Sequence, residues 1–344
     1  MANMKPTILF VDDEPNILRG LQRLFRAQRD IWNLEFVGGG QEAVNWLQDN
    51  DPYAIVTDMR MPSVDGGNLL SQAARMQRAE LRLVLSGEAD RQLTFNTVGT
   101  SHQFFSKPCD DRLLVRAITQ AYLLGSDLLF AAQRKLISNL TSLPVSQRVN
   151  IALAEATGQK ASLADLINIV ASEPALAIRV LQLANSSYFG RPADTLSIAA
   201  GVKLLGKDVI RSIWEQNKLV SVTMDENVGQ ILDELSGHAV VTARRTFDLS
   251  RLNGAADKDC EDAYAIGLLS WVGDVIAAGM PAASGMFENK HMVAASSYIS
   301  CIYGLPHRTT DSLEMLSKSP DLPAQGDARA RELGAVLFEN RRAA

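Results

Sequence analysis

The chain has 344 residues, which is too long for one ordinary domain and favours two. Hydrophobic residues make up 47% and charged residues 21%, values that exclude disorder, collagen and a coiled-coil rod for the chain as a whole. The formal net charge is −5 and no basic run occurs, so neither nucleic acid nor an anionic membrane is expected as a partner.

Cysteines and apolar stretches indicate the compartment. The three cysteines, Cys109, Cys260 and Cys301, have no CxxC spacing and predict neither a disulfide framework nor a zinc site. The apolar run at 8–11 is too short for a signal peptide core, and the longest apolar stretch, 265–280, is short of a span and contains Asp274. We therefore expect a cytoplasmic protein.

Residues 1 to about 125 alternate short apolar runs with helical patterns. The runs expected to be buried strands are 8–11, 34–37, 54–57, 81–85 and 103–106. After the first run, Leu21, Leu24 and Phe25 continue one helical face that begins at Ile17. This alternation predicts an α/β domain with a doubly wound, five-stranded parallel sheet that is covered on both faces.

The fifth helix begins at Asp110-Asp111, and no proline interrupts the chain between Pro108 and Pro144. We expect an extended connecting helix over 110–140, with Gly125 as its weak point. Apolar residues at 114, 117, 121, 124, 128 and 131 alternate spacings of three and four, which is compatible with a coiled-coil seam and a homodimer. The alternative, which we favour for 110–122, is that this face simply packs on the sheet.

Helical patterns fill the rest of the chain, and they predict an all-α second domain over 138–344. The expected helices are 146–157, 162–171, 174–187, 194–204, 207–222, 229–252, 261–278, 290–303, 308–318 and 327–340. Glycine and proline stops such as Gly158 and Gly206 separate them.

Charged or polar side chains follow four of the predicted strands. Asp12 and Asp13 end the first strand and Asp58 ends the third, while Ser86 and Lys107 end the fourth and fifth. In an open parallel sheet these ends form the ligand crevice, and three converging carboxylates need a cation such as Mg²⁺. With a hydroxyl and an ammonium added, the set suits a phosphoryl group, and one carboxylate could become an acyl phosphate.

The motifs around these residues resemble the receiver domain of two-component response regulators over residues 5–125. They are Ile8-Leu9-Phe10-Val11-Asp12-Asp13-Glu14, Asp58-Met59-Arg60-Met61-Pro62 with Asp65-Gly66, Leu85-Ser86-Gly87 and Lys107-Pro108. The resemblance implies a flavodoxin-like fold with Asp58 as phosphoacceptor. It also implies that Ser86 and Lys107 bind phosphoryl oxygens, and that Mg²⁺ is held by Asp13, Asp58 and the carbonyl of Arg60, with Asp12 reaching it through water.

Phe104 stands at the place of the family's switch aromatic, three residues before the lysine. Phenylalanine has no hydroxyl, so a hydrogen-bonded rotamer switch is excluded. A switch that works by packing alone and an ordinary core position remain equally open.

The run from Ser172-Glu173-Pro174 to Tyr188-Phe189-Gly190, with Leu143-Pro144 before it and the stretch 200–206 after it, resembles the HDOD family. HDOD domains are non-catalytic relatives of the HD phosphohydrolases. Physically the run is one capped helix, and Asn185-Ser186 near its end is more simply a structural cap than a ligand site.

A hydrolase of the HD type would need an adjacent His-Asp pair to hold metal. His238 lies where the first family histidine falls, but Ser270 and Trp271 occupy the pair. The other histidines, His102, His291 and His307, are too few and too scattered to build a binuclear site. We therefore expect no cofactor in the helical domain and no catalysis beyond phosphoryl acceptance on Asp58.

The sequence thus favours a response regulator. A sensor histidine kinase or phosphotransfer protein would act upstream, and the helical domain would act on an unknown protein downstream. The alternative is a phosphohydrolase or phosphodiesterase regulated by a receiver. Direct transcription control is a weaker third hypothesis, because the arginine pairs at 244–245 and 341–342 do not make a basic recognition helix.

Overall fold

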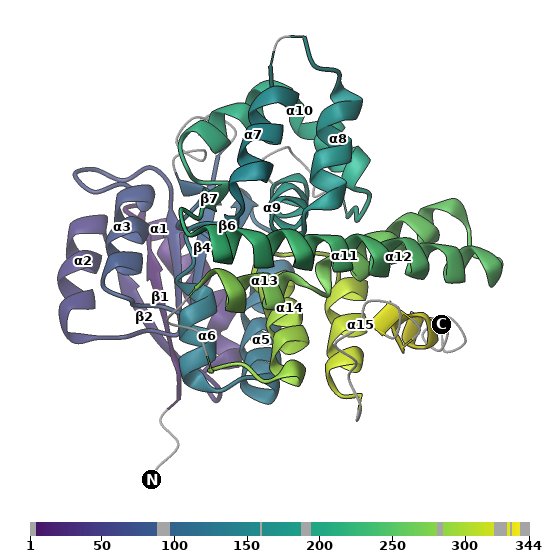
Figure 1. Cartoon of the computed structure of the whole chain (residues 1–344). Coiled ribbons are helices and arrows are strands. Elements are labelled where there is room, and N and C mark those ends of the chain that lie inside the picture. The colour runs from purple at the N-terminus through teal and green to yellow at the C-terminus, as the bar shows by residue number, and fades with distance from the viewer. Residues whose placement is uncertain are drawn as a thin grey trace. The chain divides into compact units, whose positions relative to one another are not determined.

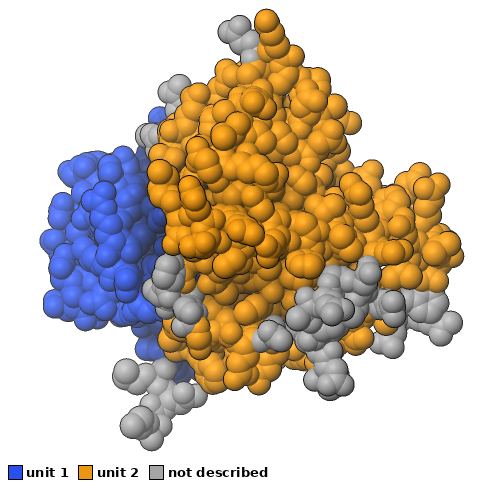
Figure 2. Space-filling view, viewed as in Figure 1, with its two compact units in different colours: residues 1–123, 134–141, 186–192 blue, residues 124–133, 142–185, 193–344 orange. Residues whose placement is uncertain are grey.

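The computed structural model describes residues 5–87, 97–158, 160–186, 194–280, 285–319, 329–330 and 332–337. It divides into two compact units (Figures 1 and 2). The first unit comprises residues 1–123, 134–141 and 186–192, and the second comprises residues 124–133, 142–185 and 193–344.

A five-stranded parallel sheet forms the centre of the first unit. Its strands are β1 (Thr7–Val11), β2 (Asn33–Val37), β3 (Ala54–Asp58), β4 (Leu81–Ser86) and β5 (Gln103–Ser106). They lie in the order β2-β1-β3-β4-β5, with every neighbouring pair parallel. All five predicted strands are confirmed, and so is the doubly wound fold.

Helices cover both faces of this sheet. They are α1 (Pro15–Leu24) with a 3₁₀ turn over Phe25–Gln28, α2 (Gly40–Asp49), α3 (Gly66–Arg75) and α5 (Asp111–Leu128). Alternate residues along each strand face opposite sides: Leu9 and Val11 pack in one core with side chains of α2 and α3. On the other face Phe10 packs on Phe25, and Tyr122 of α5 packs against Trp32. The fourth helix expected between β4 and β5 falls largely on residues 88–96, outside the described ranges.

The segment after the sheet differs from the single helix expected over 110–140. Helix α5 ends at Leu128, and α6 (Ala131–Ser138) begins after Leu129-Phe130. The Gln133 side chain accepts a hydrogen bond from the Phe130 amide at 2.9 Å and so starts a new helix, as in a capping box. Gly125, the expected weak point, lies inside α5.

The second unit is mostly helical, which confirms the expected helical domain, but it also contains one small sheet that an all-α domain would not have. Strands β6 (Leu143–Val145) and β7 (Val220–Val222) form a parallel pair. The helices are α7 (Gln147–Ala156), α8 (Leu163–Ser172), α9 (Pro174–Ala184), α10 (Ile198–Glu215), α11 (Glu226–Leu252), α12 (Asp257–Leu269), α13 (Val272–Gly279), α14 (Asn289–Ile302) and α15 (His307–Ser317). Helices α11 and α12 run side by side as a long hairpin (Figure 1).

Three helix boundaries differ from expectation for local reasons. Helices predicted over 194–204 and 207–222 join in α10, which kinks at Gly206 (φ 75°), and the end of the second segment is β7. The helix predicted over 261–278 is divided into α12 and α13 at Ser270-Trp271. There α13 approaches α14 closely, because a Cβ at Gly273 would lie 1.8 Å from the Met292 carbonyl oxygen.

Within the described ranges, no single helix combines the length and the apolar character that a membrane crossing requires. Helices α8 and α9 meet that requirement only when taken together, and they are bent by 114° where they meet.

A buried arginine ties the end of α6 to the sheet within the first unit. Arg82 of β4 is fully buried and donates to the carbonyl oxygens of Ala79 (3.0 Å), Thr100 (2.6 Å) and Ser138. His102, also buried, accepts from the Arg82 amide through Nδ1 at 3.0 Å, so its Nε2 proton is free to donate to the Ser138 carbonyl at 2.9 Å. The chain after α5 is thereby fastened at the amino-terminal ends of β4 and β5.

Replacing Arg82 should therefore be costly. Arg82→Met leaves several buried carbonyl groups without their donor, and we expect the free energy of unfolding to fall by about 3 kcal/mol in guanidinium titration. The control is Arg78→Met, a partly exposed side chain that donates to the Gln48 carbonyl and lies 3.8 Å from Asp51. Its loss should cost less than about 1 kcal/mol, and equal losses for the two variants would contradict the anchoring role of Arg82.

Candidate functional site

Three charged side chains meet at the carboxyl edge of the sheet in the first unit. Lys107, directly after β5, donates from Nζ to Asp12 Oδ2 at 2.8 Å and also pairs with Asp58 Oδ1. Asp12 is 1% exposed and Asp58 is 7% exposed, so both carboxylates are withdrawn from solvent. One ammonium therefore bridges two buried carboxylates, at the ends of β1 and β3, and offsets one of their two negative charges.

Backbone contacts orient these carboxylates. The second oxygen of Asp58 accepts from the Arg60 amide at 2.8 Å, and that of Asp12 accepts from the Glu14 amide at 2.9 Å. The loop after β3 folds back tightly on Asp58, because a Cβ at Gly66 would lie only 2.2 Å from the Asp58 carbonyl oxygen. Gly66 belongs to the Asp65-Gly66 motif of the sequence, and this close approach is the steric reason for a glycine at that position.

The electrostatic environment shifts the pKa values of both Asp58 and Lys107. Burial raises the pKa of Asp58, while Lys107 and the Arg60 amide oppose that rise. Burial by itself would lower the pKa of Lys107, but its contacts with Asp12 and Asp58 outweigh burial and raise it. Lys107 is thus held as a cation beside the carboxylate that would have to be charged in order to act as a nucleophile.

Asp13 lies next to Asp12 with an exposed side chain. Among the described residues, no group of three His, Cys, Asp or Glu side chains is gathered closely enough to hold a metal ion. The donor set nevertheless fits Mg²⁺, which keeps several waters and needs only one or two carboxylates. Asp13 and Asp58 could supply them, with Asp12 and the Arg60 carbonyl close by in sequence.

The other predicted residues of this edge lie on β4 and β5. Ser86 ends β4, directly opposite Ser106, and its hydroxyl donates to the Gly87 carbonyl at 3.2 Å. The Lys107 amide donates to the Ser86 carbonyl at 2.9 Å, which joins the two strand ends. Phe104 is 3% exposed and packs in the core on the side of α2 and α3, facing inward.

The second unit brings together His238 and Trp271, two of the residues that the HDOD resemblance singles out. His238 of α11 stacks on Trp271, with ring centroids 5.6 Å apart and an interplanar angle of 16°. Ser270 is buried and donates to the Gly267 carbonyl at 2.8 Å, and Trp271 Nε1 donates to Thr242 Oγ1 at 2.9 Å. The Ser270 hydroxyl and the Trp271 indole N–H are therefore both used in hydrogen bonds within the helical unit, and the Trp271 ring is used in stacking.

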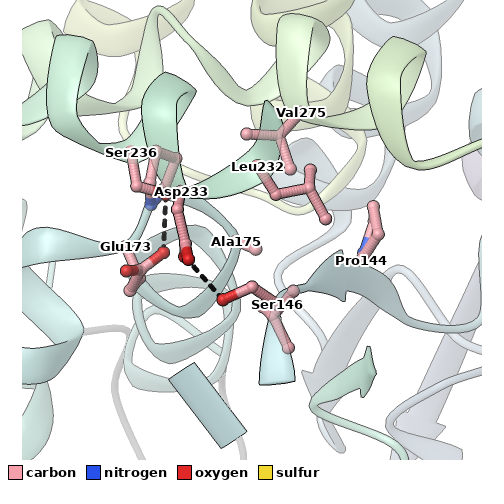
Figure 3. Close-up of a pocket in the computed structure, with 10 residues that line it drawn as sticks. Pro144, Ser146, Glu173, Ala175, Leu232, Asp233, Ser236 and Val275 are labelled. Carbon is pink, nitrogen blue, oxygen red and sulfur yellow. Dashed lines mark hydrogen bonds between the residues drawn. The ribbon is translucent and has the colours of Figure 1, made fainter. Parts of the chain in front are cut away.

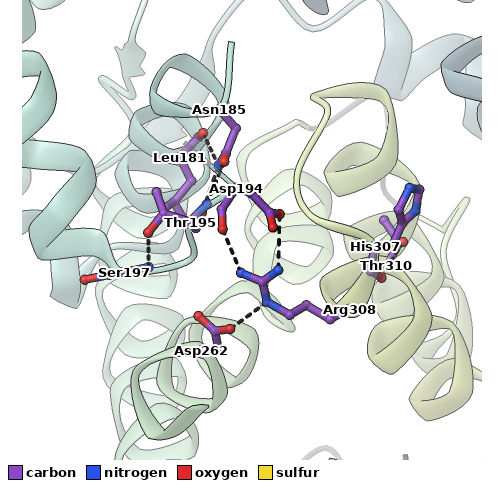
Figure 4. Close-up of polar contacts among 9 residues, drawn as sticks. All are labelled: Leu181, Asn185, Asp194, Thr195, Ser197, Asp262, His307, Arg308 and Thr310. Atoms are coloured by element: carbon purple, nitrogen blue, oxygen red, sulfur yellow. Dashed lines mark hydrogen bonds and ion pairs between the residues drawn. The ribbon is translucent and has the colours of Figure 1, made fainter. Parts of the chain in front are cut away.

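The Asn185 position of the HDOD resemblance is structural. Asn185 donates to the carbonyls of Leu181 (2.9 Å) and Thr195 (2.8 Å) and accepts from the Thr195 amide at 2.9 Å (Figure 4). Next to it, Arg308 of α15 donates to Asp262 at 2.6 Å and to Asp194 at 3.2 Å. The interpretation of Asn185 as a cap agrees with these contacts, and the Arg308 cluster had no signal in the sequence.

A second carboxylate cluster lies around the start of α9 (Figure 3). Glu173 is 4% exposed and accepts from Ser236 Oγ at 2.7 Å and from Arg148 at 3.0 Å. Arg148 also pairs with Asp233 at 2.9 Å, and Asp233 accepts from Ser146 Oγ at 2.6 Å. Burial raises the pKa of Glu173, while Ser236 and Arg148 oppose the rise.

Comparison with known proteins agrees with the geometry of both units. The family described as "Response regulator receiver domain" matches residues 8–119, and the family "HDOD domain" matches residues 143–292. Residues 8–119 therefore belong to the response regulator receiver family, and residues 143–292 belong to the HDOD family, which is related to the HD domains. The chain thus combines a response regulator receiver domain with an HDOD domain.

Individual relatives match the first unit. The hydrogenase transcriptional regulatory protein HoxA of Bradyrhizobium diazoefficiens is 28% identical over 122 residues, 35% of this chain and 24% of its own. The transcriptional regulatory protein YesN of Bacillus subtilis is 25% identical over 118 residues, 33% of this chain and 31% of its own. This chain spans less than a third of these relatives. The crystal structure of a receiver domain from an HD domain-containing protein of Pseudomonas fluorescens is 26% identical, covers 36% of this chain and 98% of its own, and has a TM-score of 0.33.

The raised pKa of Glu173 predicts a pH dependence of stability. A carboxyl whose pKa is raised by folding stabilises the fold below its unfolded pKa, and this contribution is lost as pH rises through the folded value. We therefore expect the wild type to lose stability relative to Glu173→Gln as pH rises from about 4 to about 7, measured by urea unfolding.

Asp165 provides a control of opposite sign. Hydrogen bonds from the Ser162 hydroxyl and amide lower the pKa of this exposed carboxyl. Relative to Asp165→Asn, the wild type should therefore gain stability as pH rises, since the charged form is favoured in the fold. If the difference in unfolding free energy between the wild type and Glu173→Gln stays constant with pH, the raised pKa of Glu173 is contradicted.

Proposed function

We propose that Asp58 accepts a phosphoryl group and that its phosphorylation controls the HDOD domain. The observation that carries this proposal is the pairing of Lys107 with both Asp12 and Asp58 at the carboxyl edge of the sheet. An ammonium held there compensates negative charge at the atoms where a phosphoryl group would be added.

The chemistry is a phosphoryl transfer to a carboxylate. Oδ of Asp58 attacks phosphorus of a phosphohistidine on a sensor kinase or phosphotransfer protein, or of a small acyl phosphate. The bond from phosphorus to the donor atom breaks with its electron pair left on the donor. Lys107 and the Ser86 hydroxyl bind phosphoryl oxygens. Asp13, Asp58 and the Arg60 carbonyl, with Asp12 through water, would hold Mg²⁺, and the ion would supply positive charge beside the transferred group.

The output proposal is that the helical domain acts by binding another protein and carries out no hydrolysis. It is supported by Trp271 and Ser270 at the pair positions, since an indole cannot ligate metal and the hydroxyl is hydrogen-bonded internally. The domain boundaries we propose are 1–125 for the receiver, 110–140 for the connecting segment and 138–344 for the output domain. Phe104 responds through packing alone, because it has no hydroxyl to exchange hydrogen bonds.

Intact mass spectrometry tests the phosphoacceptor. After incubation with Mg²⁺ and acetyl phosphate, we expect one added phosphoryl group on the wild type and none on Asp58→Ala. The exposed Asp49→Ala, at the end of α2, should be modified like the wild type. An adduct that persists in Asp58→Ala, or none in the wild type, would remove Asp58 from the phosphoacceptor role.

Lys107→Met tests the electrostatic part of the site. Lys107 lowers the pKa of Asp58 against the effect of burial, so its loss should raise that pKa further. We expect the rate of adduct formation to be slower and its pH midpoint to move upward, measured by mass spectrometry across the pH range. A slower rate with an unmoved midpoint would show that Lys107 acts on the bound phosphoryl group only.

A further inference from the structure

A buried arginine from beyond the HDOD family match lies at the degenerate HD position. Arg329 belongs to a helical turn at 329–330 and is 1% exposed. Its guanidinium donates to both oxygens of Asp274, at 3.0 and 3.3 Å, and to the Ser270 carbonyl at 3.1 Å. Its Cζ lies 3.9 Å from the centroid of the Trp271 ring.

These contacts are those of a recognition pocket for a planar cation. A carboxylate that accepts two parallel N–H donors fits the guanidinium fork, and an indole face favours a flat, weakly hydrated cation. An ammonium carries charge but offers neither the fork nor the stacking plane. Asp274 and Trp271 are thus matched to the shape of their partner as well as to its charge.

Asp274 also explains why the pocket needs an occupant. It is 9% exposed, burial raises its pKa, and Arg329 opposes that rise. A buried carboxylate without a cation is strongly destabilising. In the sequence, Asp274 was notable only as an interruption of an apolar stretch, and nothing pointed to a partner 55 residues away.

The segment that carries Arg329 packs on the same unit. Leu333 is fully buried and Val336 is 7% exposed. A Cβ at Gly334 would lie 2.9 Å from Leu249 Cδ1 of α11, so this short helix approaches α11 closely. The arginine is therefore delivered by a segment with apolar anchors of its own.

We infer that the helical unit contains a guanidinium-binding pocket, formed by Trp271, Asp274 and the Ser270 carbonyl, and that Arg329 is its resident ligand. The chain thereby fills the HD position with a fixed cation of its own and fastens residues 329–330 and 332–337 to the HDOD core. The pocket takes a planar guanidinium in preference to other cations. This inference does not depend on phosphorylation of Asp58, so either can fail without the other.

Chemical rescue in the full chain tests the pocket. Arg329→Ala should lower the unfolding midpoint of the helical unit by about 5 °C or more. Millimolar ethylguanidinium should restore at least half of that loss and move the indole N–H resonance of Trp271, whereas ethylammonium at the same concentration should do neither. Rescue should vanish in Arg329→Ala combined with Trp271→Leu.

Two further variants keep the test decisive. Arg329→Lys retains the charge and should therefore fold even if the alanine variant does not, but its unfolding midpoint should lie well below that of the wild type because an ammonium offers neither the fork nor the stacking plane. Arg251→Ala, at the exposed end of α11, should leave the midpoint unchanged and create no response to ethylguanidinium. Equal rescue by both cations, no rescue by either, or wild-type stability of Arg329→Lys would overturn the inference.

Discussion

Lys107 holds the carboxylates of Asp12 and Asp58 together at one edge of a parallel sheet, and two buried negative charges could not share that edge without it. The contact requires β1, β3 and β5 to end at the same side, which only parallel strands joined by helices provide. It also requires the loop after β3 to close on Asp58, which explains the need for Gly66. The strand order, the loop after β3 and the pairing of Lys107 with the two carboxylates therefore depend on one another.

The same physical rule recurs throughout the described chain: a buried charge is stable only with a partner of matching geometry. Arg82 satisfies carbonyl groups at the opposite ends of β4 and β5 and so fastens the end of α6. In the helical unit Glu173 is paired with Arg148, and Asp274 with Arg329. Each partner therefore compensates a charge that would otherwise lie alone in a medium of low dielectric.

The receiver fold could be predicted from the sequence because its signals are local. Each strand is a short apolar run, and each charged residue of the candidate site lies at the end of a strand or just after it, so a parallel sheet brings them together. Features that depend on distant contacts could not be predicted. The break before α6 comes from Gln133 accepting the Phe130 amide, which an uninterrupted helical pattern does not reveal. The strands β6 and β7 are too short to show a period. The resemblance draws attention to His238 and Trp271, whose rings stack, but Arg329, which lies over the Trp271 ring, belongs to no motif.

The central claim is that the acidic site of the first unit controls the helical unit, and hydrogen–deuterium exchange of the full chain tests it most directly. The sample should be compared with and without acetyl phosphate and Mg²⁺, alongside Asp58→Ala, with the extent of phosphorylation measured by mass in each case. We expect peptides from residues 143–317 to change their exchange rates in the phosphorylated wild type and to remain unchanged in Asp58→Ala. Full phosphorylation with changes confined to residues 5–123 would contradict control of the HDOD domain by Asp58.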